Sequence, residues 1–167
     1  IDYIYLIEYG KKITEEKIRR AVNMTKDAGI HVLGNFIFGL PDDNMDTMEE
    51  TFSLAKTLNC EYANFYATMA YPGSKLYEYA LEKHIKLPEN WLGYSQLSED
   101  TLPLPTKYLS AGEVLWFRDK AFDDYYSSKE YLNMMEQKFG SHLVEHISDM
   151  LKYRLRRKHA VTGKDML

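Results

Sequence analysis

The stretch NFIFGLPDDN, residues 35–44, passes from strand-forming residues into a turn of glycine, proline and acids. The run from Asn35 to Phe38 is largely aromatic or β-branched, which is typical of a strand. Gly39 and Pro41 mark a turn, and Asp43 or Asn44 can cap a helix after it. The stretch therefore predicts one strand-to-helix step of an α/β fold.

The same step occurs three times along the chain. Strands are expected at residues 1–7, 30–38 and 62–69, and the second shows so little alternation that we expect both of its faces to be buried. Helices are expected after Thr14, after Asp43 or Asn44, and after Pro72-Gly73, where Leu76, Tyr77, Ala80 and Leu81 would point inward. A spacing of roughly thirty residues indicates parallel strands with right-handed crossovers. Three such strands cannot close a barrel, so we expect a C-terminal piece of a larger α/β protein.

The second half of the sequence has a different character. Residues 86–107 lose periodicity and contain three prolines, which predicts an irregular connection. Helices are expected after Ser110, with one apolar stripe, and then at residues 131–139 and 141–158. The stripe comprises Val114, Phe117, Arg118, Ala121, Phe122 and Tyr125. The basic residues Arg154, Arg156, Arg157 and Lys158 are interpreted as a solvated helix end.

Composition excludes several classes of protein. With 167 residues and 45% hydrophobic content, the chain can build a core. A net charge of −4 argues against a nucleic-acid or anionic-membrane surface, and no apolar run approaches the roughly 20 residues of a membrane span. Cys60 is the one cysteine, so neither a disulfide within the chain nor a multi-cysteine metal site is expected. A reducing, cytoplasmic setting fits this usage.

A binding site is expected where the strands end. In parallel α/β folds ligands lie at the carboxyl ends of the strands, and three segments converge there: residues 8–10, 39–43 and 70–73. Gly39 lets backbone approach a ligand closely, and Phe65, Ala67 and Met69 share a face that suits a planar ring. The alternative is structural, because a strand-to-helix turn with a good cap has the same residues.

Two longer stretches, FIFGLPDDNMDTMEET and FYATMAYPGSKLYEYA, resemble the C-terminal half of the radical SAM enzyme domain. The resemblance rests on Ile37-x-Gly39-x-Pro41 followed by acids and on Pro72-Gly73-Ser74-x-Leu76-Tyr77. It covers roughly residues 7–85 and is similar in particular to the class that often carries an N-terminal cobalamin-binding domain.

The resemblance implies the C-terminal part of a partial (β/α) TIM-type barrel over residues 1–85. An irregular connection at 86–109 and a helical C-terminal extension at 110–167 would follow. It also implies S-adenosylmethionine at the strand ends, a [4Fe–4S] cluster and, in that class, cobalamin. The implied reaction is radical methylation or another radical rearrangement of a small or unknown substrate. The implied cofactor-binding residues are Glu8 toward the ribose, Asn35, Ile37 and Gly39 toward the adenine, and Tyr66, Ala67 and Thr68 as a wall beside it.

The sequence also departs from the family pattern. The triad C-x3-C-x2-C that ligates the cluster is absent, so this chain alone is expected to be inactive. The missing N-terminal half of the barrel would be the partner that supplies it. Asn35 stands where the family has a glycine, and Tyr9 stands where it has a serine.

Other interpretations stay open at this point. His142 and His146 lie four residues apart with Glu145 between them, but no third metal ligand is evident. Trp91 either frames a substrate mouth or packs against the fold. In a second class of function, the chain is a non-catalytic scaffold or partner-binding module that uses the helices of residues 110–158. A cysteine triad upstream of residue 1 would separate the two classes.

Overall fold

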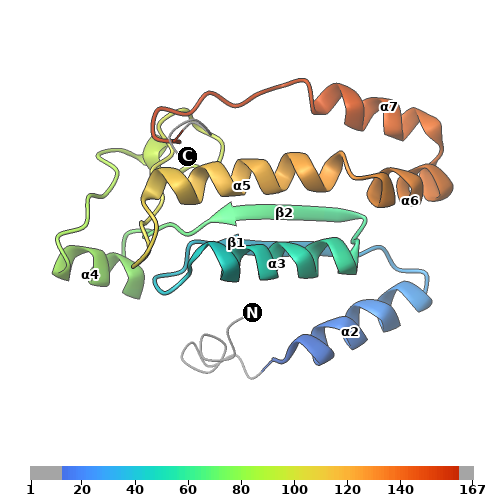
Figure 1. The fold of residues 1–167 in the computed structure, drawn as a ribbon, viewed down its shortest axis with the longest axis horizontal. Coiled ribbons are helices and arrows are strands. Elements are labelled where there is room, and N and C mark those ends of the chain that lie inside the picture. The colour runs from blue at the N-terminus through green and yellow to red at the C-terminus, as the bar shows by residue number, and fades with distance from the viewer. Residues whose placement is uncertain (1–12, 162–167) are drawn as a thin grey trace.

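The computed structural model describes residues 13–161, and a two-stranded parallel sheet lies among its helices (Figure 1). The strands pair in register from Leu33 opposite Tyr62 to Phe38 opposite Ala67. The elements in chain order are α2 (Glu15–Asp27), β1 (Leu33–Phe38), α3 (Met45–Leu58), β2 (Tyr62–Ala67), α4 (Lys75–Glu82), the 3-10 helix η1 (Trp91–Tyr94), α5 (Ala111–Tyr126), α6 (Lys129–Phe139) and α7 (Ser141–Met150).

This arrangement is a mixed α/β fold in which helices dominate. The strand expected at residues 1–7 and the site residue Glu8 lie outside the described residues, so the partial barrel stays a prediction. The divisions at residues 85/86 and 109/110 also stay predictions. No helix within residues 13–161 has the length and apolar character needed to cross a membrane.

Helix starts follow the capping residues that the sequence contains. The Thr14 side chain accepts a hydrogen bond from the Lys17 N–H, which confirms it as the cap of α2. Asn44, rather than Asp43, caps α3, where Asn44 and Thr47 form a reciprocal capping box. These caps fix where each helix begins relative to the preceding turn.

Two expectations about helices are wrong. The last helix ends at Met150 instead of continuing to residue 158. Residues 151–161, here called the tail, have no helix or strand and run back past α5 (Figure 1). Leu81 of α4 was expected to point inward but is exposed. Its neighbour Ala80 is buried, as expected.

The main core covers one face of the sheet. α3 lies along β1 and α5 along β2 (Figure 1). Aromatic rings meet between these layers: Phe65 of β2 packs edge-on to Phe52 of α3 and Tyr125 of α5, and Phe38 of β1 packs edge-on to Phe117. Because α5 supplies so much of this core, it is integral to the packing of the strands.

The opposite face of the sheet is uncovered by residues 13–161. We call it the open face, and its side chains are Leu33, Asn35, Ile37, Tyr62, Asn64 and Tyr66. Leu33, Ile37 and Tyr62 are each about half exposed, and the Asn64 amide donates to the Asn35 side chain at 3.0 Å. The sequence predicted that β1 is buried on both faces. This expectation is wrong for the described residues, because the side chains of β1 alternate between the core and the open face.

The two edges of the sheet also differ. The edge of β2 away from β1, here called the outer edge, is closed by side chains instead of another strand. Its bonds are Ala63 N–H and C=O to the Tyr126 hydroxyl, Phe65 C=O to Arg118 Nε, and Ala67 N–H and C=O to the Gln96 amide. The far edge of β1 pairs with no strand within residues 13–161. β2 is thus finished as an edge strand, whereas β1 is not.

Candidate functional site

The turn after β1 is held by one carboxylate. Asp43 Oδ2 accepts the backbone N–H groups of Gly39 at 3.0 Å and Leu40 at 2.8 Å. Its Oδ1 accepts the Thr47 hydroxyl at 2.8 Å. Asp43, a buried carboxylate that accepts these three donors, fixes the path between β1 and α3 and so serves the geometry of the turn.

Gly39 is required by helix packing. Its φ of +80° favours glycine, and a Cβ at this position would lie 2.4 Å from Cγ1 of Val114 in α5. The space that a side chain would need is therefore occupied by α5. The interpretation that Gly39 is there to admit a ligand lacks support in this geometry, although its backbone still lies at the carboxyl end of β1.

The expected site residues fall on different sides of the sheet. Asn35, Ile37 and Tyr66 share the open face, with Ile37 directly opposite Tyr66 in the register. Ala67 is 1% exposed, its side chain lies on the core face, and both its backbone groups are bonded to Gln96. Thr68 is buried and donates its hydroxyl to the Phe38 carbonyl at 2.9 Å. The residues with access to a ligand are thus the three on the open face.

The apolar wall expected for a planar ring lies on the core face. Phe65 and Ala67 are covered there, and Phe65 stacks parallel to Phe38 with ring centroids 5.9 Å apart. Met69, which follows the strand, is also buried. The interpretation of this wall as a ligand surface is therefore wrong, because the helices occupy it.

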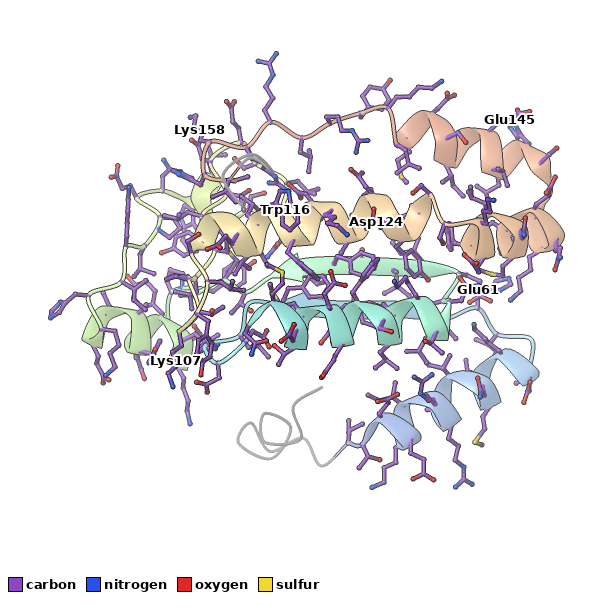
Figure 2. The ribbon with its side chains drawn as sticks, in the orientation of Figure 1. Glu61, Lys107, Trp116, Asp124, Glu145 and Lys158 are labelled. Atoms are coloured by element: carbon purple, nitrogen blue, oxygen red, sulfur yellow. The ribbon has the colours of Figure 1, made fainter. Side chains whose placement is uncertain are left out.

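Two tryptophans have contrasting positions. Trp116 of α5 is partly buried and packs against the main core (Figure 2). Trp91 of η1 is 75% exposed, with its ring 5.7 Å from that of Tyr94. Packing thus accounts for Trp116 and leaves most of Trp91 facing solvent.

Polar side chains that were not among the expected site residues gather beside the outer edge of β2. Arg118 is buried, donates Nε to the Phe65 carbonyl at 2.8 Å, and pairs with Asp119 at 2.7 Å. Arg157 of the tail pairs with the same Asp119. Its interpretation as part of a solvated helix end is wrong, because its side chain is only 4% exposed. An arginine inside the apolar stripe of α5 was the available signal for Arg118.

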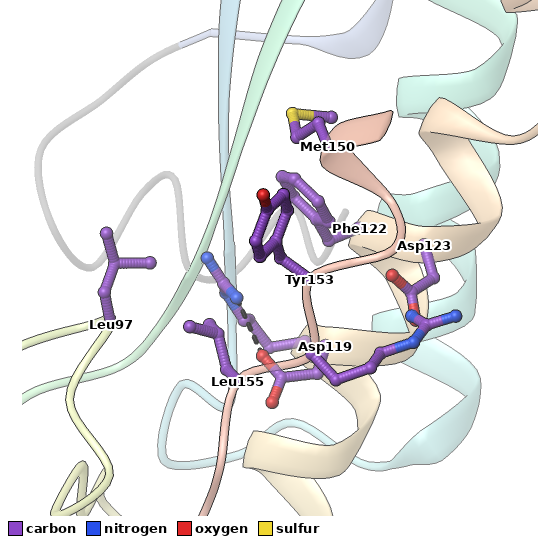
Figure 3. Close-up of a pocket in the computed structure, with 9 residues that line it drawn as sticks. Leu97, Asp119, Phe122, Asp123, Met150, Tyr153 and Leu155 are labelled. Carbon is purple, nitrogen blue, oxygen red and sulfur yellow. Dashed lines mark hydrogen bonds and ion pairs between the residues drawn. The ribbon is translucent and has the colours of Figure 1, made fainter. Parts of the chain in front are cut away.

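A pocket of about 240 Å³ opens between α5 and the tail (Figure 3). Phe122, Met150 and Leu155 supply apolar surface. The charges at its wall are already paired, Arg118 with Asp119 and Arg154 with Asp123. The pocket therefore offers apolar surface to a ligand, because the charged groups at its wall are already engaged in ion pairs with one another.

The described residues do not supply a metal site. Within residues 13–161, no three His, Cys, Asp or Glu side chains gather closely enough to hold an ion. His142 is almost fully exposed and lies 3.8 Å from Glu145. Cys60 lies just before β2, at the amino end of that strand and away from the carboxyl ends where a ligand is expected. It is buried, and burial raises the pKa of its thiol. A [4Fe–4S] cluster does not fit these groups.

Comparison with known proteins finds two relatives. The chain is 33% identical over 117 residues to a protein of Pyrococcus horikoshii named as an uncharacterized methyltransferase, a match that covers 70% of this chain and 25% of that protein. It is 35% identical over 69 residues to the anaerobic magnesium-protoporphyrin IX monomethyl ester cyclase of Rubrivivax gelatinosus, covering 41% of this chain and 12% of that protein. No family model matches the chain.

The chain spans only part of the length of each relative. It spans about a quarter of the length of the first relative and about an eighth of the second. Both relatives are consistent with membership of a superfamily related to the radical SAM enzymes.

Proposed function

We propose that this chain is part of a larger S-adenosylmethionine-dependent enzyme of the radical SAM type. Its open face would form part of the surface on which the adenosyl group of the cofactor lies, here called the cofactor shelf. The observation that carries the proposal is the open face itself. There Ile37 and Tyr66 lie opposite each other near the carboxyl ends of two parallel strands, and Asn35 lies on the same face two residues before Ile37. Similarity to a methyltransferase supports methyl transfer as the reaction class.

The chemistry of this face suits an adenosyl group. Ile37 is 49% exposed and Tyr66 is partly exposed opposite it, so the pair offers apolar surface to a flat ring. Tyr62 N–H bonds to the Val32 carbonyl and Thr68 N–H to the Phe38 carbonyl. Since backbone groups alternate in direction, Asn35 and Ile37 turn their N–H and C=O away from β2. A strand added beside β1 would bond to these groups, so the polar edge of adenine would instead meet the side-chain amide of Asn35 on the open face.

The chain's own contribution would be binding and orientation. The Asp43 turn and the closed outer edge of β2 fix the two strand ends, so the shelf would be rigid before a ligand arrives. The cluster and any cobalamin would be held by other parts of the enzyme. Radical chemistry, the cobalamin requirement and the small-molecule substrate therefore belong to the proposal for the whole protein.

Titration of S-adenosylmethionine into the full-length natural protein, followed by isothermal calorimetry, tests the proposal. Ile37→Thr keeps a β-branched residue but removes apolar surface, and we expect about fivefold weaker binding. Ile30→Thr is the matched control, because Ile30 is also exposed but precedes β1. Equal affinities in wild type, Ile37→Thr and Ile30→Thr would reject the shelf. No binding by the wild-type protein would reject the cofactor and favour a scaffold.

A further inference from the structure

We propose that Arg157 is a positioning residue, which holds the carboxyl end of β2 in place through Gln96. This inference rests on the proposed function, because it concerns the strand end that would carry the shelf. Arg157 lies in the tail and does not contact β2 directly. It contacts the loop that contains Gln96, Ser98 and Thr101, and Gln96 bonds to β2.

The contacts of Arg157 use its whole guanidinium group. Nε and Nη2 donate to the two oxygens of Asp119 at 2.8 and 2.9 Å, a bidentate pair with α5. Nη1 donates to the Ser98 carbonyl and the Thr101 hydroxyl, at 2.9 and 2.7 Å. Nη2 donates its other hydrogen to the Gln96 carbonyl at 2.9 Å. Every N–H of a buried arginine thus has an acceptor, which fixes the loop against α5.

Gln96 carries this constraint to the sheet. Its Oε1 accepts the Ala67 N–H at 3.0 Å, and its Nε2 donates to the Ala67 carbonyl at 2.8 Å. An amide side chain here takes the place of a neighbouring strand. The next residue, Thr68, bonds to the Phe38 carbonyl through both its N–H and its hydroxyl. The chain of bonds therefore runs from the tail to the ends of both strands.

Asp119 joins a second arginine to the same edge. Arg118 shares Oδ1 of Asp119 and donates Nε to the Phe65 carbonyl, two residues before Ala67. Burying two guanidinium groups around one carboxylate is costly in desolvation, so stability alone is a weak reason for the arrangement. Its geometric effect is specific, because both arginines constrain alternate residues on the outer edge of β2. We infer that the cluster serves to position this edge.

The tail makes further contacts with the same loop. It has no regular structure, and Lys158 adds a backbone bond to the Glu99 carbonyl and an ion pair with Asp100 in the same loop. Arg154 is the contrasting case: its side chain is 66% exposed, and its hydrogen bond and ion pair go to Asp123 of α5 instead of to the loop. Arg154→Gln is therefore a matched control for Arg157→Gln.

The test uses the full-length natural protein and two readouts: affinity for S-adenosylmethionine and hydrogen exchange of the Ala67 amide. Arg157→Gln should weaken cofactor binding about two- to tenfold and speed exchange at Ala67 by a similar factor. Arg154→Gln should change neither quantity. In a Gln96→Ala background, Arg157→Gln should have no further effect on affinity, because the link to β2 is already absent.

Additive effects in that double variant would overturn the positioning role, as would equal effects of Arg154→Gln and Arg157→Gln. Should Arg157→Gln fail to fold, Arg157→Lys tests the same link. Lysine keeps the positive charge beside Asp119 but has too few donors for all the acceptors of Arg157, and unchanged exchange and affinity in this variant would reject the inference. If the wild-type protein binds no cofactor, the proposed function fails, while Ala67 exchange still decides whether Arg157 positions β2.

Discussion

Removing the charge of Glu61 is expected to destabilise the protein strongly at neutral pH. Glu61 precedes β2 at its amino end (Figure 2). It is only 5% exposed. Its Oε2 accepts the Val32 N–H at 2.8 Å, and its Oε1 pairs with Lys138 of α6 and lies 3.7 Å from His31 Nδ1. One carboxylate thus joins both strands to a helix. Glu61→Gln keeps the shape but removes the charge.

The magnitude follows from the pKa of Glu61. Burial raises the pKa, but the hydrogen bonds from Lys138 and Val32 outweigh burial and lower it to about 2 from a usual value of 4.5. Each pKa unit corresponds to about 1.4 kcal/mol, so the charged form contributes up to about 3 kcal/mol to folding. Lys138 is 37% exposed, so solvent screening brings the expected loss to about 2 kcal/mol.

The pH dependence has a definite sign. Because the folded-state pKa is depressed, the stabilisation is fully present above the unfolded pKa of about 4.5 and disappears as the pH falls toward 2. Urea unfolding of wild type and Glu61→Gln by circular dichroism, at steps from pH 7 to pH 2.5, measures this difference. Urea leaves ionic strength unchanged. The two curves should converge over the acid range.

The control is Glu136→Gln, the same substitution at an exposed position on α6. It should change the free energy of unfolding by less than about 0.5 kcal/mol. A Glu61→Gln penalty that equals the control, or one that persists undiminished at pH 2.5, would refute the assignment of this stability to an ionised Glu61.

Three further outcomes are expected. Gly39→Ala should lower the free energy of unfolding by about 2–4 kcal/mol through backbone strain and the clash with Val114. Adding Val114→Ala to Gly39→Ala should recover part of that loss, and calorimetric melting of the single and double variants checks this. Tyr126→Phe should cost about 1–3 kcal/mol in urea unfolding, because it leaves Ala63 N–H and C=O without their partner at the outer edge of β2. Cys60 should react slowly with a thiol reagent in the native protein and quickly in urea, since burial both covers the thiol and raises its pKa, and equal rates would contradict that placement.

Local signals in the sequence located much of the fold. Thr14 and Asn44 cap helices because their side chains bond to backbone a few residues away, an interaction that depends on short spacing alone. The same is true of the turn that Asp43 holds. The strands at Leu33–Phe38 and Tyr62–Ala67 were recognisable from their aromatic and β-branched content, with ends shorter than expected.

The site was harder to predict, since its features depend on distant parts of the chain. Gly39 could be recognised as special, but its packing against Val114 required knowing where α5 lies. Arg157 looked like one of several terminal basic residues, because its partners Asp119 and Gln96 are 38 and 61 residues earlier. Ala67 alternates correctly with Tyr66, but the sequence does not show which of the two faces the helices.

The two unlike edges of the sheet restrict how the fold can continue. Tyr126, Arg118 and Gln96 occupy the outer edge of β2, so a further strand can add only beside β1. α2 packs on the side of the sheet that α3 covers, with Lys26 donating to the carbonyls of Leu58 and Asn59 at 2.7 and 2.8 Å. A strand joined to β1 by a right-handed crossover through α2 would then lie beside β1, on the side away from β2. The apolar side chains of Leu33 and Ile37 are half exposed at that border, and a strand there would extend the open face beside them. The order of strands expected from the sequence and the unfinished edge of β1 thus agree on where the rest of the cofactor shelf would be built.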